Sequence, residues 1–174
     1  GGHITTGVGT LNLNGTVTVN GNPNGQAIID GNMSIFAPRI FNTVGHFFSP
    51  DLRINAAVFG TGGGITKNGD GELGLTASNS YTGLTLVNDG LLLVHHSFAL
   101  GATNSGTVVN SGGALLLSFG VGVGLEPLTL AGAGQSVFGA LSSSFGSNSW
   151  AGNIVLTNDP VISVEAGDFL NLSG

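Results

Sequence analysis

The stretch that decides the fold is residues 62–94, which read GGGITKNGDGELGLTASNSYTGLTLVNDGLLLV. Short runs that alternate aliphatic and polar residues, such as Leu84-Thr85-Leu86-Val87, are separated here by Asn-Gly and Asp-Gly dipeptides. Alternation with a period of two predicts β-strands, and the dipeptides predict tight turns because Asn, Asp and Gly tolerate a positive φ. We therefore expect short strands joined by turns.

The same pattern continues on both sides, from Thr10-Leu11-Asn12-Leu13 to Val161-Ile162-Ser163-Val164. Gly accounts for 32 of the 174 residues, and only 7% of the residues are charged. Gly interrupts every window that is long enough for an amphipathic helix, and strong helix formers such as Lys and Glu are scarce. The chain is predicted to be all-β, with negligible helix.

An internal repeat indicates which all-β fold to expect. The segment Thr85-Leu86-Val87-Asn88 matches Thr107-Val108-Val109-Asn110 at an offset of 22 residues. A variable period near 20 residues is typical of a β-solenoid, in which each coil buries its aliphatic side chains on those of the next coil. An antiparallel sandwich built from Asn-Gly hairpins remains open. In the solenoid, copies of a Gly-x-Leu-x-Leu motif place one column of side chains in the core: Leu73, Leu75, Leu86, Leu91, Leu93, Leu115 and Leu117.

Residues 62–94 also resemble the autotransporter-associated β-strand repeat, or passenger-associated transport repeat. The matching landmarks are the glycines at 62 and 63, Lys67, Asn79, Tyr81 and Gly90, whereas Gly74 stands where the family usually has Thr or Ser. The resemblance implies a right-handed parallel β-helix that is exported and non-enzymatic. We expect residues 1–174 to form a single module of about eight or nine coils, one unit of a longer array or fibre at the cell surface or outside the cell.

Charge excludes two classes of partner. Three basic residues against nine acidic ones give a net charge of −6. Three cations are too few for the positive surface that binds nucleic acid, and an anionic membrane is an equally poor partner. No apolar run reaches the ~20 residues that span a bilayer, so we expect no membrane insertion of this segment. The chain contains no cysteine.

Residues that could carry chemistry are interpreted as structural. Lys67 is expected to cap the edge of a coil. The segment 68–72 suits a turn better than a calcium site, since it lacks further carboxylates. His95 and His96 are adjacent on a strand, so their side chains point to opposite faces and do not chelate one metal ion. Five carboxylates stand beside Gly, Asn or Pro and are predicted to form turns: Asp30, Asp70, Asp89, Asp159 and Asp168. No catalytic, cofactor or metal site is predicted.

Aromatic residues concentrate between residues 36 and 59. Two interpretations stay open for them. They stack inside the coils, or Phe41, Phe47 and Phe48 form an exposed contact patch. A second, weaker cluster of Phe138, Phe145 and Trp150 surrounds a Gly/Ser-rich stretch, where we expect a loop.

The sequence therefore predicts a non-enzymatic structural module of an extracellular bacterial stalk, fibre or adhesin. Coil stacking would make it a rigid rod, and its partners would be copies of itself joined end to end. The first alternative is an adhesin domain that binds surface glycans. The second is a β-helix polysaccharide lyase or hydrolase, which the shortage of cations disfavours.

Overall fold

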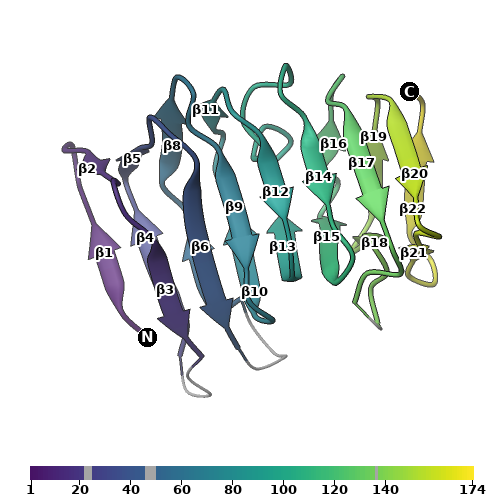
Figure 1. Cartoon of the computed structure of the whole chain (residues 1–174), viewed down its shortest axis with the longest axis horizontal. Helices are drawn as coiled ribbons and strands as arrows, with labels where there is room; N and C mark the ends of the chain where they lie inside the picture. The colour runs from purple at the N-terminus through teal and green to yellow at the C-terminus, as the bar shows by residue number, and fades with distance from the viewer. Residues whose placement is uncertain (22–24, 46–49, 136) are drawn as a thin grey trace.

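The computed structural model describes residues 1–21, 25–45, 50–135 and 137–174. Its strands stack side by side along the long axis, with the two termini at opposite ends (Figure 1). Every pair of hydrogen-bonded strands in the described residues is parallel, and the strands inside each sheet pair with strands from the coils before and after them. The fold is therefore a parallel β-solenoid, which excludes the antiparallel sandwich.

Four sheets run along the solenoid. Sheet A consists of β1 (His3–Thr5), β4 (Ala27–Asp30), β7 (Leu52–Ile54), β10 (Glu72–Leu75), β13 (Gly90–Val94), β15 (Gly113–Ser118), β18 (Leu141–Ser144) and β21 (Ile162–Val164). Sheet C consists of β3 (Val17–Asn20), β6 (Arg39–Val44), β9 (Ile65–Asn68), β12 (Thr85–Val87), β14 (Thr107–Val109), β17 (Leu128–Ala131) and β20 (Ile154–Thr157).

The third side of the solenoid is formed by two shorter sheets. Sheet B, in the N-terminal half, consists of β2 (Leu11–Asn12), β5 (Asn32–Ser34), β8 (Ala57–Gly60) and β11 (Ser80–Tyr81). Sheet D, in the C-terminal half, consists of β16 (Gly122–Val123), β19 (Ser147–Trp150) and β22 (Phe169–Leu172). Within the described ranges no residue is helical, as the glycine content predicts. The described part of the chain accordingly contains no helix long and apolar enough to cross a membrane.

The solenoid has about seven coils, so the prediction of eight or nine was too high. In the described residues, sheet C contributes seven strands, and β21 and β22 begin a further coil. The estimate failed because it applied a period near 20 residues to the whole chain, although several coils are longer. Leu73 pairs with Leu92 after 19 residues, but His3 pairs with Ile28 after 25 and Leu115 with Leu141 after 26.

The core is a set of aliphatic rows that run along the interior. Leu73, Leu92 and Leu115 are paired in register across three neighbouring strands, and all three are fully buried. The predicted column is therefore right for Leu73, Leu75, Leu115 and Leu117 and wrong for Leu86, Leu91 and Leu93. Aligning Leu91 with Leu73 shifted the register by one residue, and such a shift moves every side chain of a strand to the opposite face.

Leu91 and Leu93 lie instead on the outer face of sheet A. There they form a small second core with Ala114 and Leu116, against which Phe138 packs from the connection between β17 and β18. Leu93 is only 7% exposed, although it points away from the interior. A chain segment outside the coils therefore covers the apolar outer face of β13 and β15.

Candidate functional site

Lys67 lies inside the solenoid at the end of β9 and is fully buried. Its Nζ donates hydrogen bonds to the backbone carbonyls of Asn68 (3.0 Å), Gly69 (2.6 Å) and Asp89 (3.0 Å). Burial lowers the pKa of Lys67 to about 8, and the negative charge of Asp89 opposes this effect. Lys67 therefore ties the turn of its own coil to the turn of the next one, as predicted.

Gly90, another residue of the repeat motif, lies against the Lys67 side chain. Its φ is 72°, which disfavours residues with a side chain. A Cβ at this position would lie 2.3 Å from the carbonyl oxygen of Gly69 and 2.6 Å from Nζ of Lys67. The glycine and the lysine of the repeat motif thus form one structural unit.

Asn79 and Tyr81, the other landmarks of the motif, are also buried. Oδ1 of Asn79 accepts a hydrogen bond from the backbone N–H of Val58 (2.8 Å), and Nδ2 donates to the carbonyl of Ala99 (2.6 Å). The amide therefore bridges the preceding and the following coil. The Tyr81 hydroxyl pairs with Oγ1 of Thr85 at 2.7 Å, and burial raises the pKa of Tyr81 well above its usual value.

Glu126 is a buried acid that the sequence analysis missed. Its side chain is 2% exposed, and Oε1 accepts a hydrogen bond from Oγ1 of Thr107 at 2.5 Å. The Trp150 indole donates to the backbone carbonyl of Glu126 at 2.7 Å. Burial raises the pKa of Glu126 to about 7, and the hydrogen bond from Thr107 opposes this effect. A Gly-Leu-Glu-Pro sequence carries no signal that its acid faces the core.

The sequence analysis also missed Asp51 and Asn148, because no local pattern shows that these polar residues are buried. Oδ2 of Asp51, which is 7% exposed, accepts a hydrogen bond from the backbone N–H of Glu72 at 2.8 Å. Oδ1 of Asn148 accepts from the backbone N–H of Val121 at 2.8 Å, so it binds a neighbouring coil as Asn79 does. Only the structure shows that Asn148 and Asn79 have similar roles.

The predicted turn carboxylates are spread along the solenoid. Oδ1 of Asp89 accepts from the N–H of Gly90 (2.9 Å), and Oδ1 of Asp168 accepts from the N–H of Gly146 on the preceding coil (2.7 Å). Asp159 has a φ of 53° in a turn, and Asp70 is exposed in the bend between β9 and β10. These positions agree with the turn interpretation.

Asp30 has a different role, at the end of β4. Its Oδ1 accepts a hydrogen bond from Nδ2 of Asn55 at 2.8 Å, and Oδ2 pairs with the His3 imidazole. The bond from Asn55 and, second, the one from His3 lower the pKa of Asp30. Thr76 extends this row by donating to Oδ1 of Asn55 at 2.6 Å. Asp30 therefore belongs to a polar ladder on the outside of the solenoid.

The adjacent histidines contact different aromatic rings. His95 meets Phe119 edge to face at a centroid distance of 5.2 Å, whereas Nδ1 of His96 accepts from the backbone N–H of Phe98 at 3.1 Å. Burial and the nearby Arg53 lower the pKa of His95. Residues 69–71 connect β9 to β10, and Asn68 and Glu72 are the flanking strand residues. Among the residues with described positions, no three His, Asp or Glu side chains are grouped closely enough to hold a metal ion.

Of the predicted contact patch, the structure describes only Phe41, which does not belong to an exposed patch. Phe41 is fully buried in β6 and belongs to the core, because its side chain faces the interior of sheet C. Phe47 and Phe48 lie outside the described residues. The loop expected around Phe138, Phe145 and Trp150 is wrong, because this stretch forms β18 and β19; Trp150 is buried in β19, whereas Phe145 is 62% exposed.

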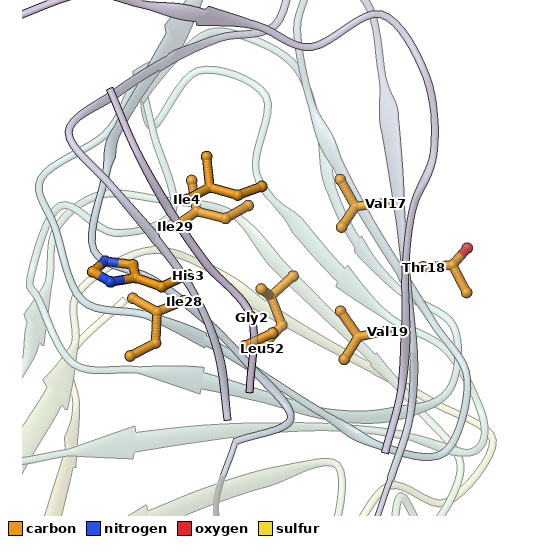
Figure 2. Close-up of a pocket in the computed structure, with 10 residues that line it drawn as sticks. Gly2, His3, Ile4, Val17, Thr18, Val19, Ile28, Ile29 and Leu52 are labelled. Atoms are coloured by element: carbon orange, nitrogen blue, oxygen red, sulfur yellow. The ribbon is translucent and has the colours of Figure 1, made fainter. Parts of the chain in front are cut away.

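The N-terminal end of the solenoid opens into a cavity of about 320 Å³. Figure 2 shows Val17 and Val19 pointing into it from β3, and Ile4 and Ile29 facing them from sheet A. Ile4 is paired with the interior residue Ile29 and is still 50% exposed. The first coil therefore leaves part of the apolar interior open.

The comparisons with known proteins give a similarity to an autotransporter adhesin. No protein-family model and no solved structure matches the chain. Over 116 residues, 67% of the chain, it is 34% identical to a part of the adhesin BmaC autotransporter of Brucella suis biovar 1 (strain 1330). The chain spans only 3% of the length of that protein. It is therefore similar to a small segment of an autotransporter adhesin.

Proposed function

We propose that this chain is a non-enzymatic module of a bacterial surface protein and forms a stiff section of a stalk, fibre or adhesin. The proposal rests on the hydrogen bonds that the polar residues of the repeat motif make inside the solenoid. Lys67 and Asn79 bind the backbone of neighbouring coils, and Tyr81 binds a buried threonine. These groups hold coils together and are not directed at a substrate.

The similarity to an autotransporter adhesin supports a location at the cell surface or outside the cell. The right-handed coil remains what the repeat resemblance implies. A hydrolase or lyase is disfavoured, because the buried lysine is surrounded by backbone carbonyls. Incubation with acidic polysaccharides, with and without calcium, is expected to release no sugar. Sugar release by the purified chain would contradict the proposal.

The ends of the solenoid support the finer proposal that modules join end to end. Ile4 continues an interior row at one end and is 50% exposed, and Leu156, paired with the buried Leu130, is 55% exposed at the other. Terminal strands with unpaired backbone groups above an apolar interior favour the addition of another coil. Stacking would cover both ends at once.

Sedimentation velocity and negative-stain microscopy over a concentration series test this joining. The 174-residue chain is expected to form rods that grow in length with concentration. The variant Ile4→Lys places a charge in the open end and should stop the growth, whereas Val8→Lys, on a fully exposed turn residue, should not. Rods that form equally well with Ile4→Lys would contradict end-to-end joining.

A further inference from the structure

One edge of the solenoid carries four exposed phenylalanines. Phe98, Phe119 and Phe145 lie in the connections that follow β13, β15 and β18 of sheet A, and Phe169, after β21, is the first residue of β22. We call them the phenylalanine edge: Phe98, Phe119, Phe145 and Phe169, which are 62%, 65%, 62% and 69% exposed. Three of them occur in the same local sequence, as Ser97-Phe98-Ala99, Ser118-Phe119-Gly120 and Ser144-Phe145-Gly146. Exposed apolar groups that gather in this way mark interaction sites.

The backbone at two of these residues is strained. Phe119 has a φ of 68° and Phe145 a φ of 54°. A bulky residue rarely adopts this conformation, which Gly and Asn adopt readily, and such strain concentrates at functional positions. Phe119 and Phe145 are 65% and 62% exposed, and their rings contact each other, and Phe119 also contacts His95, outside the buried core. The strain therefore indicates that the exposed rings themselves have a role.

The arrangement of the rings favours a protein partner over a sugar. The Phe119 and Phe145 rings are stacked at a centroid distance of 5.1 Å and an angle of 11°, and the His95 ring meets Phe119 edge to face at 5.2 Å. Their broad faces are thus turned toward each other along the solenoid axis. A sugar ring stacks on a free aromatic face, and in this pair one face of each ring is already covered by the other ring.

A second copy of this chain fits the phenylalanine edge in size and spacing. Four phenylalanines that are about two thirds exposed present on the order of 500 Å² of surface. Two facing edges would bury on the order of 1,000 Å², the lower limit for a specific interface. Side chains on successive coils are about 4.8 Å apart along the axis. A second solenoid with the same repeat can match that spacing at Phe119 and Phe145, whose ring centroids are 5.1 Å apart.

The histidines and carboxylates near the two ends of the phenylalanine edge favour antiparallel pairing of two copies. His95 and His96 lie beside the start of the edge, and Glu165 and Asp168 lie beside its end, next to Phe169. In an antiparallel pair, the imidazoles of each copy face the carboxylates of the other, and imidazole N–H groups donate to carboxylates. A parallel pair would place carboxylates opposite carboxylates.

We propose that the phenylalanine edge is an interface at which two copies of this chain pair side by side and antiparallel. The contact is isologous, so it closes at two copies and cannot grow further. It is independent of end-to-end joining, because it involves the side of the solenoid and not its open ends.

Sedimentation equilibrium of the Ile4→Lys chain, in which end-to-end joining is blocked, tests the proposal. The chain is expected to reach twice its mass of 17.3 kDa and then stop. The double variant Phe119→Asn and Phe145→Asn suits the positive φ and should fold as well by circular dichroism. It should weaken the dimer by about a hundredfold, since each substitution counts twice in a symmetric pair.

Phe36→Asn is the matched control, because Phe36 is also 62% exposed but lies between sheets B and C. It should change the dimer constant by about twofold at most. A chain that stays monomeric at hundreds of micromolar, or a dimer that the double variant leaves intact, would overturn the proposal. A glycan-array signal that the double variant removes from a monomeric chain would assign the edge to saccharides instead.

Cross-linking tests the direction of pairing. The chain has no cysteine, so introduced thiols report single positions. A mixture of Ser97→Cys and Glu165→Cys chains should form disulfide dimers faster than either chain alone, because antiparallel pairing brings the two positions together. Faster dimer formation by each variant alone would show parallel pairing and would overturn the antiparallel arrangement.

Discussion

Glu126 should make this solenoid less stable as the pH rises from about 4.5 to about 7. The carboxyl group is 2% exposed, and burial raises its pKa in the folded chain to about 7 from the usual 4.5. Between these two values the folded state binds more protons at this group than the unfolded state does. The free energy of unfolding therefore falls as the pH rises through this window and levels off above it.

The size of the effect follows from the two pKa values. A change from 4.5 to about 7 corresponds to about 3 kcal/mol between the acidic and neutral limits. For a domain of 174 residues, that is about 6–12 °C in melting temperature. The protonated carboxyl costs little when buried, whereas the ionised carboxylate loses its hydration.

Urea unfolding of the wild type and of Glu126→Gln, measured from pH 4.5 to 8.5, isolates this group. Other titrating residues, such as Glu72 and His95, are common to both chains and cancel in the difference. The wild type is expected to lose about 3 kcal/mol relative to the variant between pH 4.5 and 7.5 and nothing beyond. A difference that stays constant across this range would refute the assignment of Glu126 as a buried acid.

Three further predictions concern Lys67, Gly90 and Leu92. Relative to Lys67→Met, the wild type should gain about 3 kcal/mol as the pH rises from 8 to 10.5, because burial lowers the pKa of Lys67 to about 8; a flat difference in urea unfolding would contradict this. Gly90→Ala should lower the melting temperature more than Gly7→Ala, because a Cβ has free space at Gly7, where φ is 55°. Equal losses in melting temperature by calorimetry would show that the atoms around Gly90 move to make room for the Cβ. Leu92→Asp should prevent folding, since an unpaired buried carboxylate costs several kcal/mol; a cooperatively melting variant would disprove its interior position.

Much of the fold was predictable because its signals are local. The alternation in residues 62–94 and the Asn-Gly and Asp-Gly turns depend on backbone preferences that a few residues express by themselves. The offset between Thr85-Leu86-Val87 and Thr107-Val108-Val109 is the register observed between β12 and β14. It was readable because the two copies have nearly the same sequence and length.

The register of β13 was not predictable, because its sequence is apolar at every position. Leu91, Leu92 and Leu93 offer no polar residue to mark the outer face. Phe138, 45 residues beyond Leu93, makes an apolar outer face possible by packing over it. A contact between segments so far apart leaves no trace in the local pattern.

The sequence by itself determined the class of this protein: an all-β repeat chain with few charges, whose Lys67, Asn79, Tyr81 and Gly90 form a recognisable motif. Only the tertiary structure decided what those residues do, because Lys67 and Asn79 bind coils that lie some 20 residues away along the chain. It also decided that Phe41 is buried while Phe119 and Phe145 are exposed. Phenylalanine is equally compatible with both environments, and the face it occupies depends on the path of the whole coil.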